Sequence, residues 1–161
     1  MTYIIYLFII LFEVLLDQFS KQIVTAYLDL YQKVEVIPSF FNLTYVQNYG
    51  AGFSILEGQR FLFLFITIVA IIIFSYMLYK GKNSHIVYKT SLLLILGGTL
   101  GNFIDRIIYE GVVDFIGFKF GSYQFPIFNI ADIAIVVGVL LILLEIIRGE
   151  IYEYRNKQRK H

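Results

Sequence analysis

The sequence predicts an all-α membrane protein in which four transmembrane helices carry a small extracytoplasmic antiparallel β-sheet and a short outer loop or helix over the functional site. Of the 161 residues, 58% are hydrophobic and only 16% are charged, whereas about 25% are charged in a typical soluble domain. A water-soluble domain of this size would have more apolar surface than it could bury. Lipid is therefore the predicted solvent for most of the chain.

Four apolar stretches are candidates for the transmembrane helices, each of which needs about 20 residues. Residues 61–79 are uncharged and are bounded by Arg60 and Lys80. The other stretches are residues 3–19, 87–104 and 127–147, and each contains a few polar side chains. Four spans put both termini on the same side of the membrane.

Lysine and arginine are concentrated after the second span and in the C-terminal tail, and this bias predicts that both regions are cytoplasmic. The first span could instead be a cleaved signal peptide, but it lacks a basic segment before the apolar run and contains Glu13 and Asp17. With no repeat or linker, residues 1–161 are predicted to form a single integral membrane domain.

Two segments are predicted to lie on the outer side. Residues 33–37 and 42–48 alternate apolar and polar side chains on either side of Pro38-Ser39, which is typical of an antiparallel sheet within an outer insertion of about residues 22–60. This sheet could be a lid on the helix bundle or a platform for an extended peptide. Residues 106–127 are predicted to form a second outer loop.

Polar residues gather at the outer ends of the predicted helices. Asn102 and Arg106 share one face of the third helix, and Asn129 and Asp132 share one face of the fourth. In the first helix, Asp17 and Lys21 stand four residues apart, and we interpret them as a structural pair that offsets the cost of charge near lipid. Gly97 and Gly101 form a GxxxG pair that allows close helix approach.

Asp114 and Asp132 are the candidate catalytic residues. Asp114 lies among apolar residues in the loop between the third and fourth helices, and Asp132 stands near the head of an uncharged run. Two carboxylates held close together cannot both ionise without strong repulsion, so one keeps its proton. They would then supply a base that activates water and an acid that protonates a carbonyl oxygen or leaving group. Asn102, Arg106 and Asn129 would bind a substrate backbone or an oxyanion.

Other chemistries are less well supported. The chain has no cysteine, and its net charge of +1 gives no indication of a nucleic-acid partner. The HExxH motif of zinc proteases is absent, and His85 is predicted to be cytoplasmic, which disfavours a Ser-His-Asp triad. Two alternatives stay open: a Ser–Lys dyad or a metal site with oxygen ligands. Their residues would be Ser20, Ser54 or Ser122 with Lys21 or Lys119, and Asp105, Asp114 and Asp132, respectively.

Two non-peptidase classes are also considered. A small transporter or proton relay would need polar residues that continue through the membrane, whereas the second span is apolar throughout. A scaffold without chemistry would leave Asp114, Arg106 and Asn102 unexplained.

Five motifs, in order, resemble those of the bacterial lipoprotein signal peptidase family (signal peptidase II) over nearly the full chain. They are DQFSK, NYGAGFS, GGTLGNFIDR, GVVDF and FPIFNIADIAI. The resemblance implies an aspartic membrane endopeptidase that removes the signal peptide from diacylglyceryl-modified prolipoproteins, cutting just before the lipid-bearing cysteine. It puts the catalytic pair on Asp114 and Asp132.

The resemblance also implies the supporting residues and partners. The supporting positions are Asn48, Asn102, Arg106 and Asn129, with Asp17 and Lys21 in the first helix. It implies inhibition by globomycin-type cyclic peptides, contact with membrane lipids, and no metal or organic cofactor. We expect a monomer in the bacterial cell membrane, with cytoplasmic termini and the active site at the outer face.

Overall fold

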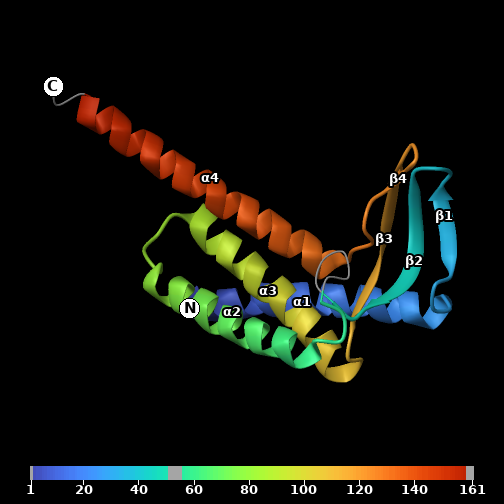
Figure 1. The fold of residues 1–161 in the computed structure, drawn as a ribbon. Helices are drawn as coiled ribbons and strands as arrows, with labels where there is room; N and C mark the ends of the chain where they lie inside the picture. Colours follow the sequence, from blue (N-terminus) through green and yellow to red (C-terminus); the bar gives the residue numbers. More distant parts are fainter. Residues whose placement is uncertain (1, 51–55, 159–161) are drawn as a thin grey trace.

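Four helices and four strands make up the described part of the chain, which comprises residues 2–50 and 56–158 of this computed structural model. The helices are α1 (Thr2–Tyr27), α2 (Arg60–Lys80), α3 (Ile86–Ile108) and α4 (Ile130–Gln158). The strands are β1 (Lys33–Ile37), β2 (Phe41–Asn48), β3 (Val112–Phe120) and β4 (Tyr123–Gln124). The helices form a bundle with the antiparallel sheet at one end (Figure 1), as the predicted fold class requires. Ser54, His161 and the second half of the NYGAGFS motif lie outside the described residues.

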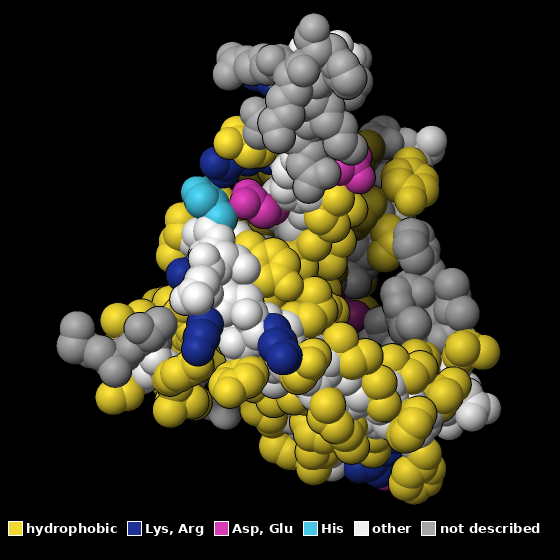
Figure 2. Space-filling view, turned by 90° about the vertical axis from the view of Figure 1, so that its left-hand side faces the viewer, with side chains coloured by type: hydrophobic (Ala, Val, Ile, Leu, Met, Phe, Trp, Pro, Cys, Tyr) yellow, Lys and Arg dark blue, Asp and Glu magenta, His cyan; other side chains and the backbone are white. Residues whose placement is uncertain are grey.

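All four helices are long and apolar enough to span a membrane. Large apolar side chains cover the flanks of the bundle (Figure 2), where a soluble protein would expose polar groups to water. α1 continues to Tyr27 and α4 to Gln158, beyond the predicted spans. α1 begins and α4 ends at the end of the bundle opposite the sheet (Figure 1).

α3 is the innermost helix because it packs against each of the other three. Its contact with α4 is close because both helices have glycine where they meet. A Cβ atom at Gly98 would overlap the carbonyl oxygen of Ala131, and one at Gly138 would lie 2.7 Å from the carbonyl oxygen of Ser91. This close approach brings the polar end of α3 against the first turn of α4.

The predicted GxxxG pair accommodates acidic side chains of α1. A Cβ atom at Gly97 would overlap the carboxyl group of Glu13, and one at Gly101 would lie 2.6 Å from Asp17 Oδ2. The two carboxyl groups therefore occupy the space that side chains would otherwise fill on α3. Asp17 has partners there, whereas both carboxyl oxygens of Glu13 are buried without a hydrogen-bond partner among the described residues.

The sheet contains the two strands predicted between residues 33 and 48, and β1 pairs with β2 in the expected antiparallel sense. The chain order of the strands is also their order in the sheet, β1-β2-β3-β4. In the register of β2 and β3, Val46 is opposite Asp114 and Asn48 is opposite Val112. β2 therefore fixes the position of Asp114 relative to the bundle.

The segment after α3 differs from its prediction. Residues 106–127 were expected to form a loop or short helix, but residues 112–120 form strand β3 in the middle of the sheet. The sequence VVDFIGFKF is rich in β-branched and aromatic residues, which favour a strand buried on both faces.

Candidate active site

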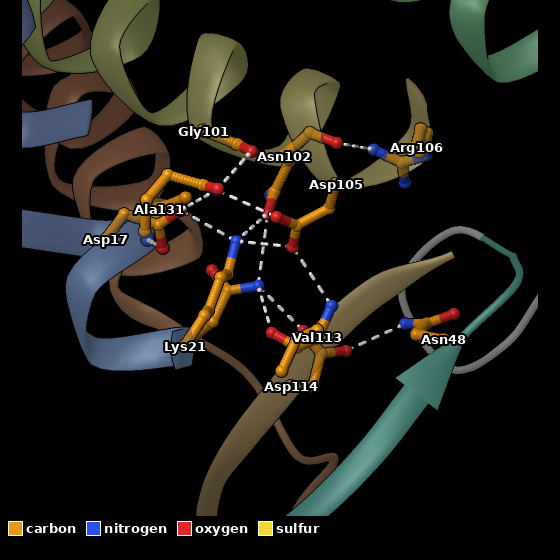
Figure 3. A network of polar contacts seen from close by, with 12 residues as sticks. Asp17, Lys21, Asn48, Gly101, Asn102, Asp105, Arg106, Val113, Asp114 and Ala131 are labelled. Carbon is orange, nitrogen blue, oxygen red and sulfur yellow. Dashed lines mark hydrogen bonds and ion pairs between the residues drawn. The ribbon is translucent and has the colours of Figure 1, made fainter. Parts of the chain in front are cut away.

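Lys21 of α1 is the buried cation at the centre of the site, and its side chain is only 4% exposed. Its ammonium nitrogen lies 2.7 Å from Asp17 Oδ2, which confirms the predicted pair, and 2.8 Å from Asp105 Oδ2. It also donates a hydrogen bond of 3.0 Å to Asn102 Oδ1 (Figure 3). Buried charges are tolerated when they are paired and hydrogen-bonded, and Lys21 meets this condition by joining α1 to α3.

Asp17 and Asp105 extend this network to the elements that carry the candidate catalytic residues. Asp17 Oδ1 accepts a hydrogen bond of 3.0 Å from the backbone N–H of Ala131 in the first turn of α4. Asp105 Oδ2 accepts one of 3.0 Å from the backbone N–H of Val113 in β3. A carboxylate at a helix N-terminus is also favoured by the helix dipole. The Lys21 network thus positions α4 and β3 together.

Asp132 is fixed by a reciprocal cap at the start of α4. Asn129 Oδ1 accepts a hydrogen bond of 2.9 Å from the backbone N–H of Asp132, and Asp132 Oδ2 accepts one of 3.2 Å from the backbone N–H of Asn129. This is the geometry of a capping box. Asp132 Oδ1 accepts a further bond of 2.8 Å from Asn102 Nδ2. Because Lys21 binds the oxygen of the Asn102 amide, the amide nitrogen faces Asp132.

Asp114 lies on β3 and is only 3% exposed. Its Oδ1 accepts a hydrogen bond of 2.7 Å from Asn129 Nδ2, and its Oδ2 accepts one of 3.0 Å from Asn48 Nδ2 at the end of β2. Burial, and after it the charge of Asp132, raises the pKa of Asp114 to about 7, although both amide hydrogen bonds act in the opposite direction. Asn129 therefore contacts both carboxyl groups, Asp114 through its side chain and Asp132 through its backbone.

Asp114 and Asp132 line one cleft of about 290 Å³, together with Asn48, Asn102 and Arg106. Apolar residues of α4 and of the segment before it complete the walls of this cleft, which we call the catalytic cleft. The cleft thus combines two carboxyl groups and several amide groups with apolar walls, as ligand sites commonly do.

Arg106 lies at the edge of the catalytic cleft. Its guanidinium group donates hydrogen bonds of 3.4 Å to the carbonyl oxygen of Asn102 and 3.3 Å to that of Gly50, and it stacks over the ring of Phe63 at 5.2 Å. Among the described residues it forms no ion pair. Its charge is therefore available to a bound ligand.

The alternative chemistries fit this geometry poorly. Asp105 contacts Lys21 and Gln18 rather than the catalytic cleft, so the three aspartates proposed for a metal site do not converge. Lys21 is bound by two carboxylates, and the Ser20 hydroxyl donates to the carbonyl oxygen of Asp17. Neither residue is placed as a nucleophile or base.

Sequence reasoning missed two parts of the network. Gln18 was not considered, but its amide nitrogen donates hydrogen bonds to Asp105 Oδ1 at 2.7 Å and to the carbonyl oxygen of Gly101 at 3.1 Å. Asp105 was considered only as a metal ligand, whereas it is the second carboxylate of Lys21. The i, i+4 spacing of Gly101 and Asp105 on α3 was a usable signal, because it puts both on the face that meets α1.

Comparison with known proteins identifies the family. The family model for signal peptidase (SPase) II matches residues 9–148. The lipoprotein signal peptidase of Listeria monocytogenes serotype 4a is 46% identical over 139 residues, which cover 86% of this chain and 90% of the relative. That of Halalkalibacterium halodurans is 43% identical over 146 residues, with coverage of 91% and 94%.

Solved structures agree with the sequence comparison. A bacterial membrane enzyme solved by the in meso method matches with a TM-score of 0.84 and 37% identity, covering 90% of this chain and 88% of the other. A second structure with the same description gives a TM-score of 0.80 and 38% identity, with coverage of 88% and 91%. From the family match, the relatives and the shared fold, the chain belongs to the signal peptidase II family, a family of aspartic-type peptidases.

Proposed function

We propose that this protein is an aspartic endopeptidase of the bacterial cell membrane. It removes the signal peptide from diacylglyceryl-modified prolipoproteins by cutting just before the lipid-bearing cysteine. Family membership supports the substrate class. The observation that carries the mechanism is that Asp114 and Asp132 line the same cleft and are both held by Asn129.

Asp114 is the acid and Asp132 the base at the start of the reaction. Asp114 retains its proton because its pKa is raised to about 7 by burial and by the charge of Asp132. Ionised Asp132 accepts a proton from a water molecule as the water oxygen attacks the scissile carbonyl carbon, and Asp114 gives its proton to the carbonyl oxygen. The tetrahedral intermediate then collapses. Asp132 protonates the leaving nitrogen, Asp114 recovers a proton from the intermediate, and both groups return to their starting states.

Three amides position the two carboxyl groups. Asn48, Asn102 and Asn129 were expected to bind substrate, and each donates a hydrogen bond to Asp114 or Asp132. Their first role in the proposed mechanism is therefore to orient the pair. Arg106 is the residue best suited to bind the substrate backbone, because its cation has no acidic partner among the described residues and lines the catalytic cleft.

The sheet end of the bundle faces outward in this proposal, and both termini are cytoplasmic. Lysine and arginine side chains are visible at the opposite end of the bundle (Figure 2), which fits the positive-inside rule. A single copy of the chain supplies both carboxyl groups and all of the supporting groups, which supports a monomer. Membrane lipids surround the apolar flanks, and globomycin-type cyclic peptides inhibit by filling the catalytic cleft.

The apolar interior argues against the transporter alternative. Beyond Glu13, away from the sheet, the buried core is a cluster of large side chains, comprising Tyr6, Leu78, Leu92, Leu93 and Leu96. Such a cluster has no chain of polar groups that would carry ions across the bundle. A flux assay in liposomes that detected proton or ion movement would favour the transporter.

The proposal is tested by cleavage of a diacylglyceryl-modified precursor with purified protein in detergent and with chelator present. Wild type should cut the precursor, whereas Asp114→Asn and Asp132→Asn should each lose activity by at least a thousandfold while keeping the wild-type elution profile and thermal unfolding. Asp29→Asn is the matched control, because Asp29 is exposed and does not line the catalytic cleft. Normal turnover by either catalytic variant would overturn the assignment.

A further inference from the structure

Two further hollows adjoin the catalytic cleft. The first, of about 410 Å³, includes Asn48 and Asp114 of the catalytic cleft and adds Val46, Tyr123 and Gln124. We call it the sheet-side cavity. The second is a groove of about 320 Å³ that includes Asp132 and otherwise has an apolar lining. The three hollows therefore meet at the two carboxyl groups: Asp114 borders the sheet-side cavity, Asp132 borders the apolar groove, and both line the catalytic cleft.

A short strap separates the sheet-side cavity from the catalytic cleft. The strap is the segment of residues 125–127, and its residues line both hollows. It is held at one end by a hydrogen bond of 2.9 Å from the backbone N–H of Phe125 to the carbonyl oxygen of Phe118. Beyond its other end, the backbone N–H of Phe128 donates to the carbonyl oxygen of Ile116 at 3.1 Å. The strap is thus bound to β3, and the sheet-side cavity is a built feature of the sheet.

The three hollows differ in chemistry. The apolar groove follows Ile133, Val136 and Val137, which are exposed on the face of α4 that would meet lipid. The catalytic cleft is lined by residues of both the membrane helices α3 and α4 and the sheet. Among the described residues, no residue of a transmembrane helix lines the sheet-side cavity, and its own side chains include the polar groups of Tyr123 and Gln124. A volume of about 410 Å³ falls within the range of about 300–1,000 Å³ that is typical of ligand pockets.

The substrate of the proposed function, on which this inference rests, also has three branches of different chemistry. Its acyl chains are apolar, its signal peptide lies in the membrane, and its mature chain is water-soluble. All three branches meet at the cysteine next to the scissile bond, which must lie at Asp114 and Asp132. Each branch therefore leaves the catalytic pair in its own direction.

We propose that the sheet-side cavity binds the first residues of the mature chain, those that directly follow the lipid-bearing cysteine. It is the hollow that leads away from the membrane helices, and it reaches the catalytic pair at Asp114. Val46 faces Asp114 across the β2–β3 pair, so it lies closest to the scissile bond, and Gln124 lies farther along the path. Val46, Tyr123 and Gln124 then determine which mature N-termini are cut efficiently.

The test compares two synthetic substrates with the same signal peptide and the same diacylglyceryl cysteine. One ends at the cysteine as an amide, and the other continues for four small residues. Gln124→Trp adds bulk at the sheet-side cavity and should lower kcat/KM for the longer substrate at least tenfold, while changing that for the shorter substrate less than twofold. Ser122→Trp is the matched control, because Ser122 is exposed on the same hairpin turn and does not line the cavity. It should leave both values within twofold.

Equal losses on both substrates, or no loss on either, would overturn the cavity assignment. A wild type that cuts neither substrate would instead refute the proposed function. A second measurement avoids dependence on how Gln124→Trp folds. A benzoylphenylalanine placed directly after the cysteine of the longer substrate should, on irradiation of the Asp132→Asn variant, crosslink to Val46, Tyr123 or Gln124. Crosslinks confined to Ile133, Val136 or Val137 would assign the mature chain to the apolar groove and refute the inference.

Discussion

Asp114 should set the alkaline limit of cleavage, because the proposed mechanism needs its proton. Burial, and after it the charge of Asp132, raises the pKa of Asp114 to about 7. A group with this pKa is protonated in about half of the molecules at pH 7, in about a tenth at pH 8 and in about a hundredth at pH 9. We therefore expect kcat/KM to fall close to tenfold for each pH unit above about 7.

Removing one hydrogen bond should move this limit in a defined direction. Asn48 Nδ2 donates to Asp114 Oδ2 at 3.0 Å, and this bond lowers the pKa of Asp114. In Asn48→Ala the ionised form of Asp114 loses that support. Hydrogen bonds to charged groups contribute about 1.5–3 kcal/mol, and one pKa unit corresponds to about 1.4 kcal/mol. The alkaline limb, meaning the pH range in which kcat/KM falls, should therefore begin about one to two pH units higher.

The assay measures kcat/KM from about pH 5 to pH 9 on a lipopeptide that has no ionisable group in this range. Thermal unfolding at each pH checks that the protein stays folded. Asn83→Ala serves as the control, because Asn83 is exposed in the turn between α2 and α3. A rate that stays level from pH 7 to pH 9, or an alkaline limb that does not move in Asn48→Ala, would refute the assignment of Asp114 as the acid.

Three further predictions concern stability in detergent. The pKa of Asp114 is about 7 in the folded protein, against 3.8 for an unperturbed aspartate side chain, so the folded state should lose up to about 4 kcal/mol of stability as pH rises from about 4 to 7. Asp114→Asn should flatten this pH dependence of the thermal midpoint, and an unchanged slope would contradict the prediction. Lys21→Met leaves two buried carboxylates without their cation and should lower the free energy of unfolding by about 3–5 kcal/mol. The control Lys33→Met removes an exposed ion pair and should lower it by less than about 1 kcal/mol. Equal losses of stability would disprove the buried network. Gly97→Ala should destabilise the protein because the new Cβ overlaps the carboxyl group of Glu13. Adding Glu13→Ala should recover part of the lost stability. If the effects of the two changes are simply additive, the contact is refuted.

The sequence was most informative where a pattern depends on local periodicity. The apolar runs predicted the four helices, and alternation predicted β1 and β2. Helical spacing also put Asn102 beside Arg106, and Asn129 beside Asp132, because side chains three or four residues apart share a helix face. The pairing of Asp17 with Lys21 followed from the same rule, and it is confirmed at 2.7 Å.

The contacts that local periodicity missed depend on how distant elements pair. Asn129 reaches Asp114 only because β3 joins the sheet in one register, and a one-residue slip would turn Asp114 to the opposite face. The ion pair of Lys21 with Asp105 depends on how closely α1 approaches α3, which the glycines of α3 permit.

The bond between Asp17 and the first turn of α4 has a consequence for the newly made protein. It joins the first helix to the last, since Asp17 Oδ1 accepts the backbone N–H of Ala131. A chain that has emerged from the ribosome only as far as α3 already contains Lys21 and Asp105, but it lacks Asp132 and the Asn129 amide that holds Asp114. If Asp114 and Asp132 are the catalytic pair, as proposed, the chain can have no peptidase activity until α4 has been made and has docked against α1.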